Sequence, residues 1–144
     1  MHSASILVTE PDMLKLAQLL DGQRRWPALE EEHRGGLGHV LASAQVVRDD
    51  EVPRDVITLN STVRATDLEA GSDHTHALVM PVHASDGAGA VSVLSPLGVA
   101  LLGRREGHEI EYRVPGSKRR LTVQQLLYQP ERVSFQREMG SFRK

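Results

Sequence analysis

The feature that most constrains this chain is a succession of short strand-like runs in its second part. They are VITLNSTVRATDL (56–68), HTHALVMPV (74–82), AVSVL (90–94), HEIEYRVP (108–115) and RLTVQQLLYQP (120–130). The runs are rich in apolar and β-branched residues, and turn-forming residues separate them. This pattern indicates an α+β chain with an antiparallel sheet, in which the glycine-rich GAGAV (87–91) is expected to be a hairpin turn.

One short helix is expected among the strands, within LSPLGVALLG (94–103). Ser95 can accept a hydrogen bond from the free amides of a helix start, and Pro96 fits the first helical position, where an N–H is not needed. Gly103 suits a left-handed residue after the last turn. The local unit is therefore strand, short helix, turn and strand.

The first part of the chain follows a helical period instead. Residues Asp12 to Leu20 place apolar side chains at helical spacing. A second helical pattern runs from about Pro27 to Val47. The polar loop DGQRRW (21–26) between them favours an antiparallel helical hairpin, a short coiled coil.

A change of composition separates the helical part from the strand-like runs. Residues 48–55 are charged and contain a proline, so we expect a linker there. These boundaries predict a helical hairpin in residues 1–50, a sheet domain in residues 51–136 and a tail in residues 137–144.

Composition narrows the possible functions. The chain has 144 residues, of which 40% are apolar, enough for one ordinary core. It contains no cysteine, which excludes disulfides and thiolate metal sites, and it shows neither a membrane span nor a signal peptide. A net charge of −2 does not attract nucleic acid, and an aromatic content of 3% provides few side chains for base stacking. We expect a cytoplasmic protein that does not bind membranes or read nucleic-acid sequence directly.

The charge is unevenly distributed along the chain. Residues 1–50 carry 5 basic and 8 acidic side chains, whereas residues 101–144 carry 10 basic and 5 acidic ones. Two basic runs flank the strand expected at 108–115. They are Arg104 and Arg105 on one side and Lys118, Arg119 and Arg120 on the other. They are either solvated turns or one patch for an acidic partner.

No pattern indicates a catalytic residue, a metal site or an intrinsic cofactor. His74 and His76 share one face of an expected strand, but no third ligand of matched geometry accompanies them. Serines and histidines are scattered, and their order alone does not assemble a triad. We therefore propose no nucleophile and no metal from the sequence.

The expected tip of the hairpin carries its own candidate residues. Glu30, Glu31 and Glu32, with Asp21 on the facing helix, would position a hard cation if they converged. The alternative is that first-turn carboxylates simply complement the helix dipole. Trp26 is either packed on the hairpin or offered to a partner.

The string VSVLSPLGVALLGRREGHEIEYRVPG (91–116) resembles the C-terminal domain of the bacterial GreA/GreB transcript cleavage factors. In that domain a strand leads into Ser-Pro, a short ALLG helix, a glycine turn and a strand ending in Pro-x-Gly. DVITLNSTVR (55–64) is similar to its first strand and LTVQQLLYQPE (121–131) to its last. Within this superfamily, the linker and the short hairpin are similar to the Rnk family, the regulators of nucleoside diphosphate kinase.

The resemblance implies a helical hairpin followed by an FKBP-like domain, a bent antiparallel sheet with one short helix. In the Gre factors this domain docks at the rim of the secondary channel of RNA polymerase, and the long hairpin carries two acidic residues to the active centre. Leu94 departs from Gre proteins that have an acidic residue before Ser-Pro. The docking residues expected here are Ser95, Pro96, Leu97, Arg104, Arg105 and Arg119.

The leading hypothesis is a non-enzymatic regulator that binds RNA polymerase near the secondary channel. It would compete with Gre factors and affect nucleoside diphosphate kinase levels, directly or through transcription. A first helix of about 12 residues spans only about 18 Å, too short to carry carboxylates deep into a channel. The alternatives are a Gre-like cleavage factor and a peptidyl-prolyl isomerase, whose fold the sheet domain would share although fold does not give function.

Overall fold

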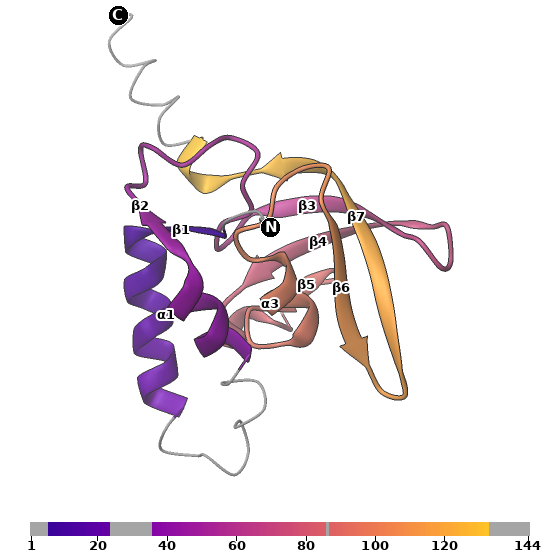
Figure 1. Cartoon of the computed structure of the whole chain (residues 1–144), viewed down its shortest axis with the longest axis horizontal. Helices are drawn as coiled ribbons and strands as arrows, with labels where there is room; N and C mark the ends of the chain where they lie inside the picture. Colours follow the sequence, from indigo (N-terminus) through magenta and orange to yellow (C-terminus); the bar gives the residue numbers. More distant parts are fainter. Residues whose placement is uncertain (1–5, 24–35, 86, 133–144) are drawn as a thin grey trace, which may run out of the picture.

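A curled five-stranded sheet dominates the computed structural model (Figure 1), which describes residues 6–23, 36–85 and 87–132. The order of the strands across the sheet is β5-β4-β3-β7-β6. The strands are β3 (Thr62–Asp67), β4 (Asp73–Val79), β5 (Ala90–Ser92), β6 (Glu109–Val114) and β7 (Ser117–Tyr128). β3 pairs antiparallel with β4 and β7, and β7 pairs antiparallel with β6. Each predicted run thus overlaps an observed strand, although β4 and β7 begin before the predicted bounds.

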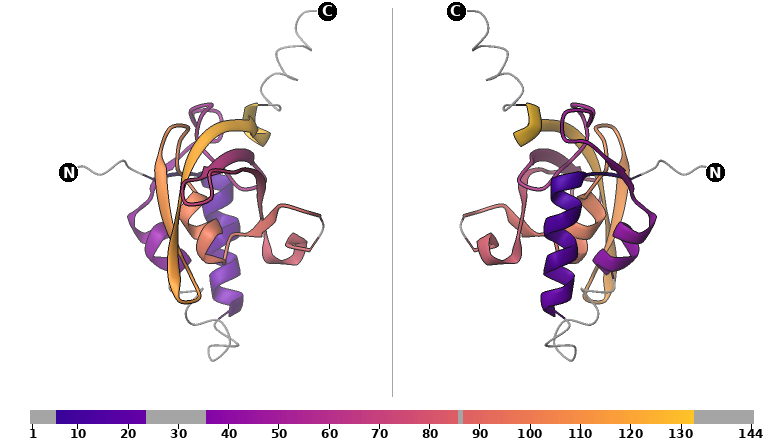
Figure 2. Two further views of the ribbon diagram at one scale, coloured as in Figure 1. Left: turned by 90° about the vertical axis from the view of Figure 1, so that its right-hand side faces the viewer. Right: turned by 90° about the vertical axis from the view of Figure 1, so that its left-hand side faces the viewer.

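The pair β4–β5 is parallel, so the predicted hairpin at 87–91 and the purely antiparallel sheet were wrong. After β4 the chain enters a 3₁₀ helix, η1 (Pro81–His83), instead of turning tightly back. Pro81 cannot donate to a strand ladder, which favours leaving the sheet here. The connection between the two strands projects from the side of the sheet (Figure 2) and brings Ala90 opposite Ala77.

The sheet curls because the pairing between β3 and β7 is irregular. Two register shifts interrupt this pairing within residues 62–65. Such bulges bend a strand and increase its local twist. The buried residues of β7 follow the same break, since Leu121 and Val123 are two apart whereas Leu126 comes three residues later.

The N-terminal part contains two short strands that the helical pattern did not predict. β1 (Leu7–Thr9) pairs in parallel with β2 (Gln45–Val47). α1 (Glu10–Gln23) follows β1 directly, and residues 36–43 form a second helix before β2.

The predicted second helix, 27–47, was therefore wrong at residues 45–47. Val46 and Val47 are β-branched and favour a strand, and the Gln45 N–H donates to the Ile6 carbonyl at 2.8 Å. Residues 24–35, which would connect the two helices, lie outside the described residues. The antiparallel helical hairpin thus stays a prediction, as does the FKBP-like character of the sheet.

One hydrophobic core joins the N-terminal elements to the sheet. Val8 of β1, Leu16 of α1 and Leu37 of the second helix are buried in the same cluster as the inward side chains of the sheet. In Figure 1 α1 and the second helix lie beside the sheet, and α3 (Pro96–Leu101) lies between them and β6. The division at about residue 50 stays a prediction, although residues 48–55 contain neither helix nor strand.

Asp12 links the start of α1 to the segment that leads into β3. The Thr9 hydroxyl accepts a hydrogen bond from the Asp12 N–H at 3.2 Å, which is the capping role of a threonine before a helix. The Asp12 carboxylate accepts one from the Leu59 N–H at 3.0 Å. Burial raises the pKa of Asp12 to about 6, against the lowering effect of the hydrogen bond from Leu59.

The predicted linker is pinned to the end of β7. The buried Gln129 side chain donates from Nε2 to the carbonyls of Pro53 and Val56, both at 2.9 Å. The Thr58 hydroxyl donates to the Glu131 carboxylate at 2.8 Å. Residues 53–58 are therefore ordered by side chains that lie more than 70 positions away in the chain.

Replacing Asp12 by Asn should change how stability depends on pH. Because the folded pKa of about 6 lies above the model value of 3.8, the contribution of Asp12 to stability is present below about pH 4 and is lost as pH rises through 6. Asn keeps an acceptor for Leu59 but carries no charge. The unfolding free energy of Asp12→Asn relative to the wild type should therefore rise by roughly 2 kcal/mol between pH 4 and pH 7.

Urea unfolding of both proteins at several pH values measures this difference. A difference that does not vary with pH would show that Asp12 titrates normally in the folded chain.

Candidate docking site

Ser95 positions the short helix α3 through two hydrogen bonds. Its hydroxyl accepts from the Gly98 N–H at 3.1 Å and donates to the Ser92 carbonyl at 2.7 Å. Pro96 occupies the first turn, and Gly103 has a φ of 78° just beyond the helix. The predicted cap, the predicted proline position and the left-handed glycine are thus confirmed.

α3 approaches the sheet most closely at Gly98. A Cβ atom at this position would overlap the Ser92 carbonyl oxygen and lie 3.0 Å from the Val93 Cα. Both of these are backbone atoms and cannot turn aside as the end of a flexible side chain can. Only glycine therefore allows α3 to lie as it does beside β5 and β6.

A groove of about 560 Å³ opens beside this turn. Three parts of the chain form it: α3 with the residue before Ser95, Gly36 of the second helix, and the end of β6 with its turn. Its lining is Gly36, Leu94, Pro96, Val99, Val114 and Pro115, together with Arg113. Among the described residues, the lining is thus apolar apart from one guanidinium group.

The predicted docking residues are only partly at this groove. Pro96 lines it and is exposed. Ser95 is half-buried and uses its hydroxyl within the fold, while Leu97 packs against the core. Arg104 and Arg105 follow the other end of α3, where Arg105 lies 3.9 Å from the Asp55 carboxylate. The docking role of each of these residues stays a prediction.

The second basic run is neutralised by acidic side chains of the same molecule. Arg119 contacts the Asp67 carboxylate at 2.6 Å, and Asp67 is almost fully buried. The Ala70 N–H and the Arg119 guanidinium hold the pKa of Asp67 below its usual value. Lys118 pairs with Glu111 and Arg120 with Glu69, each at 3.2 Å, and Arg120 also lies 3.7 Å from the Glu109 carboxylate. These three cations are thus already partnered.

Sequence reasoning missed Arg113, Val99 and Gly36 as groove residues. The Pro115–Gly116 turn signal places residue 113 near a hairpin tip, and Gly116 does have a positive φ of 76°. Nothing in the local pattern, however, shows which helix faces that tip. The contact depends on the packing of three segments that are far apart in the sequence.

The predicted hairpin-tip residues are largely outside the described part of the chain. Asp21 is exposed on α1. Trp26, Glu30, Glu31 and Glu32 all belong to residues 24–35, so their arrangement is not described.

The described residues include no set of three or more His, Cys, Asp or Glu side chains arranged to hold a metal ion. The rings of His74 and His76 are stacked on β4 with centroids 6.1 Å apart. Burial, and secondarily the charge of His74, lower the pKa of His76, which favours its neutral form. No helix in the described ranges is both long and apolar enough to cross a bilayer.

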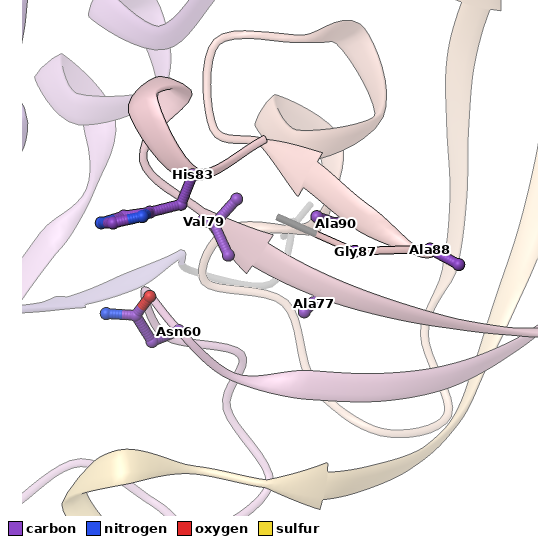
Figure 3. A pocket seen from close by; sticks show the side chains of 7 residues that line it. All are labelled: Asn60, Ala77, Val79, His83, Gly87, Ala88 and Ala90. Atoms are coloured by element: carbon purple, nitrogen blue, oxygen red, sulfur yellow. The ribbon is translucent and has the colours of Figure 1, made fainter. Parts of the chain in front are cut away.

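A second hollow of about 440 Å³ lies beside the connection between β4 and β5 (Figure 3). Ala77 and Ala90 lie on its adjacent strands, and Asn60 and His83 project at its edge. Asn60 has a φ of 71°, a conformation that asparagine tolerates better than most residues. The described lining of this hollow has no acidic side chain, lysine or arginine. We therefore do not treat it as a candidate functional site.

Comparisons with known proteins decide the family. The family described as "Transcription elongation factor, GreA/GreB, C-term" matches residues 52–128, more than half of the chain. The chain belongs to the GreA/GreB family. The match spans the whole five-stranded sheet, α3 and the groove residues from Leu94 to Pro115, whereas α1 and the second helix lie outside it.

Relatives in and around the GreA/GreB family extend the likeness to the N-terminal part. The regulator of nucleoside diphosphate kinase of Escherichia coli (strain K12) is 37% identical over 119 residues, 78% of this chain and 88% of that protein. The transcription elongation factor GreA of Thermotoga neapolitana is 31% identical over 76% of this chain and 72% of its own length. A solved GreA/GreB structure from Nitrosomonas europaea has a TM-score of 0.71 and 32% identity, covering 86% of this chain and 100% of that chain.

The close approach of α3 to the sheet predicts opposite effects at two helical glycines. Gly98→Ala should destabilise the chain by about 1–3 kcal/mol because its methyl group meets backbone. Gly22→Ala in α1, where nothing lies within 4 Å, should be neutral or stabilise by up to about 1 kcal/mol. Thermal or urea unfolding of the two variants measures this contrast, and a tolerated Gly98→Ala would contradict the close packing.

Proposed function

We propose that this chain is a non-enzymatic transcription regulator that docks on RNA polymerase, near the secondary channel, through the groove beside Pro96. Family membership supports the regulatory part of this function, since the relatives are named as a regulator and as elongation factors. The observation that carries the docking surface is the exposed apolar groove between α3 and the end of β6.

The chemistry of the groove suits a protein partner. Pro96, Val99 and Val114 present apolar groups whose removal from water on docking is favourable. Pro96 and Pro115 are rigid, so ordering them on binding loses little conformational entropy. A surface of this kind binds by shape and desolvation, and no catalytic group is needed.

The size of α1 supports docking without transcript cleavage. α1 has 14 residues and so spans about 21 Å. A Gre-like cleavage factor is the alternative, and it would depend on acidic residues in the undescribed segment 24–35. We propose that the chain occupies the docking site and competes there with the longer Gre factors. We also propose that the chain affects nucleoside diphosphate kinase levels. The name of the Escherichia coli relative suggests this effect.

Pro96→Asp should weaken binding to core RNA polymerase by about fivefold or more, because a new charge in a desolvated contact costs about 1 kcal/mol or more. The fold should remain intact, since an acidic residue in the first turn complements the helix dipole. Val82→Asp is the matched control, because Val82 lies in η1 and is 77% exposed.

Binding of the labelled variants to core enzyme, with thermal unfolding measured in parallel, tests the proposal. If Pro96→Asp binds as the wild type does, or if Val82→Asp weakens binding equally, the docking surface lies elsewhere.

A further inference from the structure

We infer that Arg113 determines which partner the groove binds. The polymerase surface that docks in the groove then carries a carboxylate beside apolar side chains. This inference rests on the docking function proposed above. It adds to that function a residue that the sequence did not single out, and it specifies the chemistry of the partner.

Arg113 is the one charged side chain among the described residues that line the groove. It belongs to β6, an edge strand of the sheet, and it is exposed. Val114 and Pro115 follow it directly and contribute apolar surface to the same groove. A partner that buries these two residues therefore also comes within reach of the guanidinium group.

Arg113 has no ion-pair partner among the described residues, unlike its neighbours on the β6–β7 hairpin. Its direct cross-strand neighbour is Lys118, also a cation. Lys118 pairs with Glu111, so this carboxylate is already engaged by another group. Like charges directly opposite each other destabilise a sheet. An anion supplied by the partner would relieve this repulsion at Arg113.

The groove fits a protein carboxylate better than a phosphate backbone. Binding to nucleic acid usually draws on several cations that neutralise successive phosphates. Here Lys118, Arg119 and Arg120 are each engaged by acidic side chains, and the other described residues of the groove lining are apolar. A guanidinium forms a planar, two-point contact with a carboxylate. In a contact that excludes water, a partner without the carboxylate would leave Arg113 unpaired, and this cost is the source of specificity.

The test compares Arg113→Gln with Lys118→Gln, two neutralising changes at directly opposed positions of one hairpin. Binding is measured at low and high salt to core RNA polymerase free of nucleic acid and, in a parallel series, to polymerase assembled on nucleic acid. Arg113→Gln should bind about five- to tenfold more weakly at low salt, and most of the deficit should persist at high salt, because a pair in a contact that excludes water is screened little. Lys118→Gln should bind within about twofold of the wild type, because Lys118 is already paired with Glu111 and does not line the groove.

Thermal stability provides an independent readout. Arg113→Gln should keep or slightly raise the melting temperature, since it removes a like-charge contact with Lys118. If Arg113→Gln binds more weakly but is as stable as the wild type, Arg113 recognises the partner and does not merely support the fold. A lower melting temperature that accounts for the lost binding would overturn the inference.

The remaining outcomes separate this inference from the proposed function. If Pro96→Asp weakens binding and Arg113→Gln does not, the carboxylate partner is wrong and the docking surface stands. If neither change weakens binding, both fail. Equal losses for Arg113→Gln and Lys118→Gln would indicate diffuse attraction instead of a specific pair. A loss seen only with polymerase assembled on nucleic acid would identify phosphate as the ligand and overturn the inference.

Discussion

The position of α3 depends on the absence of a side chain at Gly98. Because no Cβ stands between the helix and Ser92, α3 lies directly on the backbone before it. The Ser95 hydroxyl then bonds to the helix amide of Gly98 and to the Ser92 carbonyl. This one hydroxyl closes the turn on both sides and leaves the ring of Pro96 exposed. The groove exists because α3 is held there while the end of β6 extends past it.

The parts of this fold that were predictable depend on neighbouring residues. Runs of apolar and β-branched residues between turn signals located the strands, and the Ser-Pro pair located the start of α3, since both signals act within a few residues. The parallel pairs β1–β2 and β4–β5 were not predictable in this way. They depend on which segments meet after long connections, and no short-range pattern specifies that meeting. The family resemblance supplied the GreA/GreB-like arrangement that periodicity alone did not.

The candidate site also has residues that the sequence predicted and residues that it did not. Pro96 was found from its motif, whereas Arg113 became visible only when β6, α3 and the second helix were seen together. Two of the basic residues that the sequence favoured, Arg105 and Arg119, have carboxylate partners that composition does not show. Arg119, for example, pairs with Asp67, which lies 52 positions earlier in the chain. Counting charges along a sequence therefore overstates how many of them a partner can use.

The central claim is that the groove between α3 and the end of β6 is the surface that meets RNA polymerase. Amide hydrogen exchange of the chain, free and bound to core enzyme, tests it most directly because it reads every surface at once. The account predicts slower exchange on binding in residues 94–101 and 111–117, with little change in η1 and in the turn between β3 and β4. Protection confined to η1 or to that turn, with the groove unaffected, would contradict it.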